Sequence, residues 1–231
     1  MNATDASTHP SGSALGTGNG AAKPPKSFLA SIVELVLIVA VALGLALGIQ
    51  AVIIKPYRIP SGSMEPTLAV GQRVFVNRLG EDLGKPHVGE IAVFHPPASA
   101  EEQLCGPTPH SVEDGTSACS QPVPKEASVN FIKRIVAGPG DEIYVKQGHV
   151  FRRAAHTSSF VEEKDSYIKA CGQSSECNFT TPIEIPAGHW FMMGDNRGDS
   201  DDSRFWGPVP TAWIIGGAIA TYWPLDRIGS L

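Results

Sequence analysis

The pattern of hydrophobic and polar positions divides the 231-residue chain into three parts. Residues 1–27 contain almost no large apolar side chains, residues 28–54 are almost continuously apolar, and residues 55–231 alternate short apolar runs with polar turns. A segment as polar as residues 1–27 cannot bury enough apolar surface to offset the entropy lost on ordering. The pattern therefore predicts a disordered tail, an apolar helix and one folded domain.

The apolar part is long enough to cross a membrane. The stretch from Leu35 to Ile54 has Gln50 as its only strongly polar side chain, and about 20 apolar residues in a helix span the hydrocarbon core. A cleaved signal peptide is the alternative, but its apolar core is shorter, about 7–15 residues, and it does not follow a long polar tail. We predict an uncleaved anchor over residues 28–54. Glu34 lies near its start, where it can reach the interface or be neutralised, and a functional intramembrane carboxylate is the less favoured reading.

Residues 55–231 show the alternation and frequent turns of an all-β domain. The 24 glycines and 19 prolines suit short strands better than a helical bundle. Strands are predicted at residues 73–78, 89–94, 130–135, 142–145, 149–151, 185–196 (running into an acidic loop) and 212–223. The last run is also compatible with a helix, but its length and its glycine pair favour a strand. The polar stretches 98–127 and 152–182 are predicted to be surface insertions.

Charge and cysteine content restrict the partners and the compartment. The formal charge of −5 argues against a nucleic-acid partner, which would require a basic face. All four cysteines follow the apolar helix in two close pairs, Cys105 with Cys119 and Cys171 with Cys177. An even count in close pairs predicts two disulfides and an oxidising compartment. A zinc site is disfavoured, because neither pair has C-x-x-C spacing or a neighbouring histidine.

The flanking charges leave the orientation in the membrane nearly undecided. Lys23 and Lys26 precede the helix, while Lys55 and Arg58 follow it, so the positive-inside count is close to a tie. The cysteines therefore decide the prediction: the N-terminus is cytoplasmic and the domain lies outside the membrane.

The segment Ile59–Thr67 is a candidate nucleophile turn. Its prolines fix φ and its glycine permits conformations closed to other residues, so we expect a shaped turn that exposes the Ser63 hydroxyl. An ordinary linker has the same composition.

A serine nucleophile needs a base, and His189 is the only histidine in a tempting position. The other candidate is Lys133, which lies between apolar neighbours, where desolvation would lower its pKa from about 10.4 and yield a neutral amine. An exposed surface lysine is the alternative reading.

Four segments of the domain occur together in a recognisable order. They are Pro60 to Leu68; Gly71 to Val76; Phe131 to Arg134 with Gly138 to Asp141; and Gly194 to Arg197 followed by Ser200, Asp202, Ser203, Arg204, Trp206 and Gly207. This set resembles the type I signal peptidases, the Ser/Lys membrane endopeptidases that remove signal peptides from exported proteins. The resemblance runs from Tyr57 to about Pro210, and it does not cover the tail or the two cysteine-bearing insertions.

The resemblance implies a mainly β catalytic domain of the signal-peptidase type and a role for each matching residue. Ser63 resembles the nucleophile and Lys133 its general base. The Ser61 hydroxyl and the Ser63 N–H would form the oxyanion hole, Ser200 would orient the lysine amine, and Asp202 and Arg204 would form a structural ion pair. The apolar pockets for small residues before the cleaved bond, in an Ala-x-Ala pattern, would be lined by Ile59, Met64, Leu68, Phe131 and Ile132. Each of these is equally compatible with a plain core position.

The resemblance also implies partners and a location. The partners would be signal peptides of exported preproteins and membrane lipid, and the location a bacterial plasma membrane with the domain on its outer face. No cofactor is expected. A cation site in the acidic loop is disfavoured, because Arg197 and Arg204 compete for the carboxylates and the loop lacks the EF-hand pattern. Two other readings stay open: a self-cleaving Ser/Lys repressor-type protease, which would carry a DNA-binding segment, and a non-enzymatic anchored domain that binds peptides.

Overall fold

The computed structural model describes residues 28–78, 85–107, 117–121, 123–171 and 177–231. The predicted disordered tail, residues 1–27, lies outside the described residues. The chain divides into two units, residues 1–46 and 47–231, each of which is described by itself.

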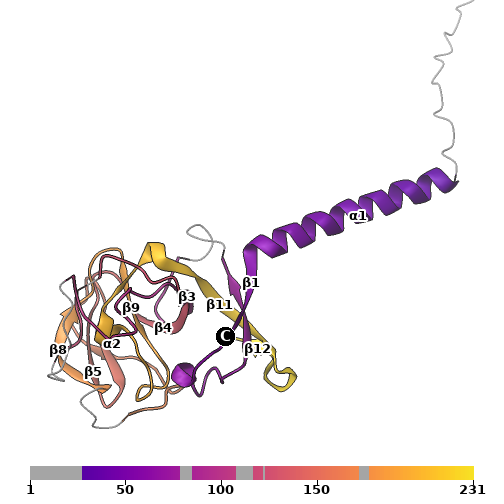
Figure 1. Ribbon diagram of the computed structural model, residues 1–231. Coiled ribbons are helices and arrows are strands. Elements are labelled where there is room, and N and C mark those ends of the chain that lie inside the picture. Colours follow the sequence, from indigo (N-terminus) through magenta and orange to yellow (C-terminus); the bar gives the residue numbers. More distant parts are fainter. Residues whose placement is uncertain (1–27, 79–84, 108–116, 122, 172–176) are drawn as a thin grey trace, which may run out of the picture. The chain divides into compact units, whose positions relative to one another are not determined.

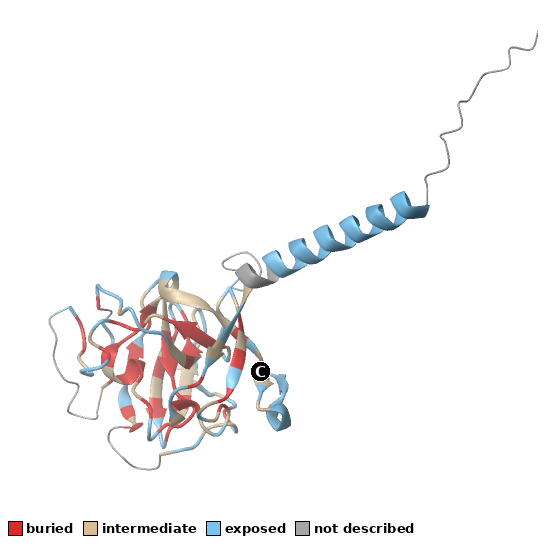
Figure 2. Ribbon diagram, turned by 45° about the vertical axis from the view of Figure 1, so that its right-hand side comes forward, coloured by how far each residue is buried: buried red, intermediate tan, exposed pale blue. Residues whose placement is uncertain are grey.

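An apolar helix occupies the segment predicted to be the anchor. Helix α1 runs over Phe28–Ile53, and residues 28–48 are exposed along its whole circumference (Figure 2). By length and composition, the part from Phe28 to Gly48 is sufficient to cross a membrane. A helix that is apolar on every side has no polar face to turn toward water, so hydrocarbon is the environment that suits it.

The described residues of the second unit form two antiparallel sheets (Figure 1). The large sheet has the order β1 (Ile54–Arg58), β2 (Arg73–Asn77), β11 (Ile214–Trp223), β3 (Ile91–Phe94), β4 (Phe131–Ala137), β9 (His189–Met193) and β10 (Val209–Pro210), with β12 (Gly229–Ser230) paired to β11. The small sheet has the order β7 (Val161–Glu162), β6 (His149–Arg153), β5 (Glu142–Lys146) and β8 (Phe179–Glu184). Short helical turns complete the fold: η1 (Gly62–Met64), α2 (Ser203–Trp206), η3 (Thr211–Trp213) and η4 (Leu225–Arg227). The predicted mainly β architecture is confirmed.

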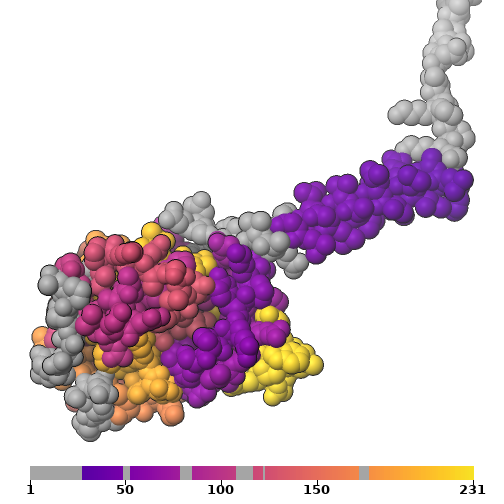
Figure 3. All heavy atoms as spheres, viewed as in Figure 1, coloured from indigo at the N-terminus to yellow at the C-terminus, as the bar shows by residue number. Residues whose placement is uncertain are grey.

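The sheet order brings the two ends of the domain together. Strand β2 pairs with β11, so that Val74 lies opposite Thr221. In the space-filling view the purple residues that follow the helix accordingly lie against the yellow C-terminal segment (Figure 3). The run from residue 212 to 223 forms strand β11 after one short turn, as its glycine pair indicated.

One sequence-based prediction was wrong in part. The stretch 152–182 is not only a surface insertion, because β7 and the first residues of β8 lie within it. Strand β8 buries Phe179 and Ile183 and pairs with β5. Its intervening positions are exposed threonines and a proline, so the apolar signal in the sequence is too sparse to reveal a strand that its neighbour stabilises.

Among the described residues the core comprises three apolar clusters, and one of them fixes the segment that follows β1. Ile59, Met64 and Leu68 pack with Val74, Val76 and Ile91 of the large sheet, and all six are almost fully buried. Full burial of a side chain of this kind is worth roughly 1.5–3 kcal/mol. The turn at residues 59–68 is therefore held to the sheet by its own apolar side chains.

Both cysteine pairs are joined in the structure, in the pairing that the sequence suggested. Cys105 is bonded to Cys119, and Cys171 is bonded to Cys177. The first bond lies in the insertion that follows β3, and the backbone N–H of Cys119 donates to the carbonyl of Arg204 at 2.9 Å. The second lies between β7 and β8, against the loop that follows β9.

Candidate active site

The predicted nucleophile lies in a short helical turn that the backbone fixes at both ends. Ile59 donates from its N–H to Gln72 and accepts from the N–H of Gly71, both at 2.8 Å. Between these contacts the chain forms η1, with Ser63 at its centre and only 8% of that residue exposed. The next residue, Met64, is fully buried and packs into the core, which anchors the turn. The sequence Pro-Ser-Gly-Ser-Met therefore forms a rigid support for one hydroxyl and not a linker.

Lys133 reaches this hydroxyl from the middle of strand β4. Its Nζ lies 2.6 Å from Ser63 Oγ, although the two residues are 70 positions apart. Only 5% of Lys133 is exposed. Burial lowers the pKa of Lys133 to about 8, and the carboxylates of Asp202, Asp201 and Asp199 prevent a larger decrease. About a tenth of the amine is then neutral at pH 7, and this form can accept the hydroxyl proton along the observed contact.

Ser61 lies beside the nucleophile on the same turn. Its hydroxyl is 3.4 Å from Ser63 Oγ, and Ser61 itself is exposed. Both serines line one cavity. The Ser61 hydroxyl can therefore donate to an oxygen atom bound next to Ser63 Oγ, which is the geometry that an oxyanion hole requires.

The loop after β9 is tied to the nucleophile turn and to β4 by Asp195. This fully buried carboxylate accepts two hydrogen bonds from the Arg134 guanidinium, at 2.9 and 2.7 Å. It also accepts one from the Thr67 hydroxyl at 2.6 Å. Arg134 follows the base in the sequence, and Thr67 lies on the turn that bears the nucleophile. One carboxylate thus joins the three segments that carry the candidate catalytic groups.

Asn196 adds a second connection to the same turn. Its backbone N–H donates to the carbonyl of Ser63 at 3.0 Å, and its side-chain amide donates to the carbonyl of Gly62 at 3.2 Å. The roles of Thr67, Arg134, Asp195 and Asn196 were not predicted. Each lies within one of the quoted motif segments, but the motif does not reveal which partners the fold will supply.

Asp202 and Arg204 form the predicted ion pair. The guanidinium donates to both carboxylate oxygens at 2.8 Å, and the N–H of Gly194 donates to Asp202 at 3.0 Å. Burial alone would raise the pKa of Asp202, but Arg204 and the Gly194 N–H hold it below its ordinary value. Arg204 also donates to the carbonyls of Arg197 and Ser200, at 2.9 and 3.3 Å. The pair therefore fixes the conformation of the loop.

Ser200, which was predicted to orient the lysine amine, makes no hydrogen bond to that amine in the described part of the chain. Ser200 is buried, and its Oγ has no hydrogen-bond partner among the described residues. Its side chain lies directly against Gly194, where an added methyl group would collide with the Ser200 hydroxyl and the Ser63 carbonyl. The glycine allows the loop and the nucleophile turn to approach each other this closely.

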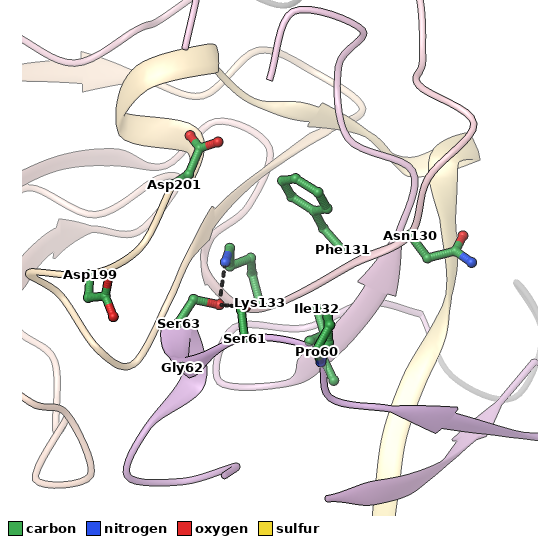
Figure 4. A pocket seen from close by; sticks show the side chains of 10 residues that line it. All are labelled: Pro60, Ser61, Gly62, Ser63, Asn130, Phe131, Ile132, Lys133, Asp199 and Asp201. Carbon is green, nitrogen blue, oxygen red and sulfur yellow. Dashed lines mark hydrogen bonds between the residues drawn. The ribbon is translucent and has the colours of Figure 1, made fainter. Parts of the chain in front are cut away.

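A cavity of about 370 Å³ lies beside the pair Ser63 and Lys133, hereafter the dyad (Figure 4). It is lined by Pro60, Ser61, Gly62, Ser63, Asn130, Phe131, Ile132, Lys133, Asp199 and Asp201. Of the five predicted pocket residues, Phe131 and Ile132 line this cavity. The other three, Ile59, Met64 and Leu68, are at most 2% exposed and belong to the core beneath the turn, so they support the cavity and do not line it.

The alternative base, His189, is not part of this cavity. It begins strand β9, pairs with Pro210 and places its Nδ1 2.9 Å from the carbonyl of Ala187. The loop that approaches Ser63 follows the other end of this strand. Lys133 is therefore the base candidate that the fold brings to the serine.

Comparison with known proteins identifies the family of the chain. The family profile described as signal peptidase, peptidase S26, matches residues 32–223. Signal peptidase I of Leptolyngbya laminosa is 33% identical over 91% of this chain and 89% of its own length. A probable signal peptidase I of Synechocystis is 33% identical, covering 81% of this chain and 71% of that protein. Signal peptidase I of Pseudomonas aeruginosa is 29% identical, with 81% and 72% covered. The resemblance seen in the motifs is thereby confirmed, and the chain belongs to the signal peptidase family, peptidase S26.

Proposed function

We propose that this protein is a membrane-anchored serine endopeptidase that removes signal peptides from exported preproteins after an Ala-x-Ala-like site, with Ser63 as nucleophile and Lys133 as general base. Membership of the signal peptidase family supports the substrate class. The observation that carries the mechanism is the 2.6 Å contact between Lys133 Nζ and Ser63 Oγ at a buried site.

The first half of the reaction forms an acyl-enzyme. Neutral Lys133 accepts the Ser63 hydroxyl proton while Oγ attacks the carbonyl carbon of the scissile bond. The carbonyl oxygen becomes an oxyanion, which the Ser61 hydroxyl and the Ser63 N–H stabilise. A fixed donor of this kind is worth about 10²–10³ in rate. Protonated Lys133 then returns the proton to the leaving nitrogen, the C–N bond breaks, and the signal peptide remains as an ester of Ser63.

The second half releases the signal peptide. A water molecule enters from the cavity and Lys133 accepts its proton, so that hydroxide attacks the ester carbonyl. Collapse of the second tetrahedral intermediate breaks the bond to Ser63 Oγ, which regains its proton from Lys133. No step of this scheme requires a cofactor.

Substrate selection follows from the apolar part of the cavity. Phe131 and Ile132 lie on the strand that carries Lys133, and Pro60 lies on the turn that carries Ser63. A shallow wall of this kind accepts small side chains before the cleaved bond and excludes larger ones by overlap. Buried Ile59, Met64 and Leu68 act indirectly, because they hold in place the turn that carries Pro60 and Ser63.

The proposed topology is a single-pass protein of a bacterial plasma membrane with a cytoplasmic N-terminus and the domain on the outer face. Helix α1 supplies the apolar span, which contacts membrane lipid. The two disulfides support an oxidising compartment for the domain.

Cleavage of a preprotein by the full chain in detergent micelles tests the proposal. Ser63→Ala, Lys133→Ala and Lys133→Arg should each lose at least about a thousandfold in kcat/KM, since removal of a nucleophile or base has effects of this order or larger and a guanidinium does not deprotonate. The matched controls are Ser128→Ala and Lys146→Ala, which alter exposed residues outside the cavity and should retain full activity. Near wild-type turnover by Ser63→Ala or Lys133→Ala would refute the dyad. Peptide binding with no cleavage by the wild type would favour a binding domain.

A further inference from the structure

Four aspartates of the loop after β9 fall into two classes. Asp195 and Asp202 are fully buried, and each accepts two hydrogen bonds from an arginine. Asp199 and Asp201 have no ion pair with any residue that the structure describes. The first pair maintains the fold of the loop. The second pair, Asp199 and Asp201, carries negative charge that no arginine of the described residues neutralises by direct contact.

The two aspartates without an arginine partner both face the catalytic cavity. Asp199 and Asp201 line it together with the dyad. They lie on one side of Ser63 and Lys133, whereas Phe131 and Ile132 lie on the other side (Figure 4). The cavity therefore has an acidic wall and an apolar wall, and the reacting hydroxyl lies between them.

Asp201 has one buried oxygen that lacks a well-formed hydrogen bond. Among the described residues, neither its Oδ1 atom nor the buried indole nitrogen of Trp206 reaches a partner at hydrogen-bonding geometry. The indole N–H is nevertheless near enough to favour the carboxylate electrostatically. A partly buried carboxylate without a full set of donors lowers the stability of a fold, so the acid at this position is not explained by packing.

Asp201 of the acidic wall is ionised in the pH range in which Lys133 loses its proton and can act as a base. Burial and the neighbouring Asp202 raise the pKa of Asp201 to about 6, and Lys133 opposes this rise. Asp201 is therefore ionised at the pH where Lys133, with its pKa of about 8, begins to lose its proton. Once the amine is neutral it no longer offsets this charge, and the nearby Arg204 is already engaged by Asp202. The working cavity thus has a local excess of negative charge.

We infer that Asp199 and Asp201 contact the residues that follow the cleaved bond and favour cationic over acidic side chains there. The inference rests on the proposed function, which assigns the apolar wall to the residues before the bond and leaves the acidic wall to those after it. The segment leaving on this side also gains an α-amino group when the C–N bond breaks, and the protonated amine has the charge that the wall attracts.

A substrate series measures this selectivity within one enzyme. Three preproteins are compared that differ only by Lys, Gln or Glu at the first two positions after the bond, with the full-length protein in detergent micelles. A single partly exposed charge pair has a modest effect, but attraction of Lys and repulsion of Glu act in the same direction. We expect the wild type to prefer the Lys substrate over the Glu substrate by about tenfold in kcat/KM. The Gln substrate should lie between them.

The variants locate the source of the preference. Asp201→Asn should reduce the ratio of kcat/KM for the Lys and Glu substrates at least threefold. Asp199→Asn should reduce this ratio less, because Asp199 is exposed. The double variant should bring the ratio close to one. Glu184→Gln removes an exposed carboxylate from β8, outside the cavity, and should leave the ratio unchanged. Because each ratio is taken within one enzyme, a smaller folded fraction in a variant does not alter it.

The wild type alone can also overturn the inference. Its Lys/Glu ratio should fall toward one between about 0.05 and 0.5 M salt, since partly exposed charges are screened; this measurement remains decisive if a variant does not fold. A wild-type ratio near one at low salt, or an unchanged ratio in Asp201→Asn, contradicts the inference. Failure of the wild type to cleave any of the three preproteins contradicts the proposed function instead.

Discussion

Replacement of the buried lysine by an apolar side chain of similar length should abolish cleavage and stabilise the protein. Lys133→Met keeps most of the side-chain volume in β4 and removes the amine. Only 5% of the surface of Lys133 is exposed. The lowering of the Lys133 pKa from 10.5 to about 8 measures how strongly the folded state disfavours the ammonium form. At 1.36 kcal/mol per pKa unit, this corresponds to about 3 kcal/mol of unfolding free energy.

The sign of this effect depends on pH. Below about pH 8 Lys133 is protonated in both the folded and the unfolded chain, and the folded state bears the whole cost of the buried charge. Between about pH 8 and 10.5 the folded protein has lost the proton that the unfolded chain still binds, so wild-type stability rises with pH. Above this range both forms are neutral and the cost is absent. The stabilisation by Lys133→Met should therefore be largest at neutral pH and decrease toward pH 10.5.

Thermal unfolding in detergent micelles at pH 7 and pH 10 measures the difference between variant and wild type. In a domain of this size about 3 kcal/mol corresponds to a Tm higher by roughly 6–12 °C. The difference between the two proteins cancels the titration of the other groups. Lys146→Met, which alters an exposed residue of β5, should leave Tm unchanged at both pH values. A Lys133→Met variant that is no more stable than the wild type at pH 7, or whose advantage persists at pH 10, would refute the reasoning.

Two further predictions concern the same site. The kcat/KM of the wild type should increase with pH and level off above about pH 8, because Lys133 acts as a base only after it loses its proton; a flat profile from pH 6 to 9 would exclude it as the titrating base. Gly194→Ala should lower activity and cost about 1–3 kcal/mol of stability, the usual range for overpacking, because the added methyl meets the Ser63 carbonyl. Gly229→Ala, where the methyl has open space, should have neither effect.

Features that depend on local composition could be predicted from the sequence. The predicted anchor is an almost continuously apolar run, the longer strands show alternation, and the turn at Ser63 lies between prolines; each is a property of neighbouring residues. The motif set also singled out Ser63 and Lys133, which the structure places in contact. The short polar strand β8 was missed, because its stability comes from pairing with β5 and not from its own residues.

Features that depend on distant pairing were decided by the tertiary structure. Lys133 contacts Ser63 only because β4 lies beside the turn, and the enclosure that lowers its pKa is a property of that arrangement. The fold also separated Phe131 and Ile132, which line the cavity, from three equally apolar residues that lie beneath it. Apolar character predicts that a side chain avoids water, but not whether protein or substrate covers it.

The acidic loop shows the same division. The sequence places four aspartates within eight residues, from Asp195 to Asp202, and they are chemically identical there. The structure gives two of them arginine partners and leaves two facing the cavity. The sequence by itself thus predicted the apolar helix, most of the longer strands and the candidate reacting groups. The tertiary structure alone decided which charges are paired with arginine and which face the cavity, because a charge takes its role from the residues that folding brings within a few ångströms of it.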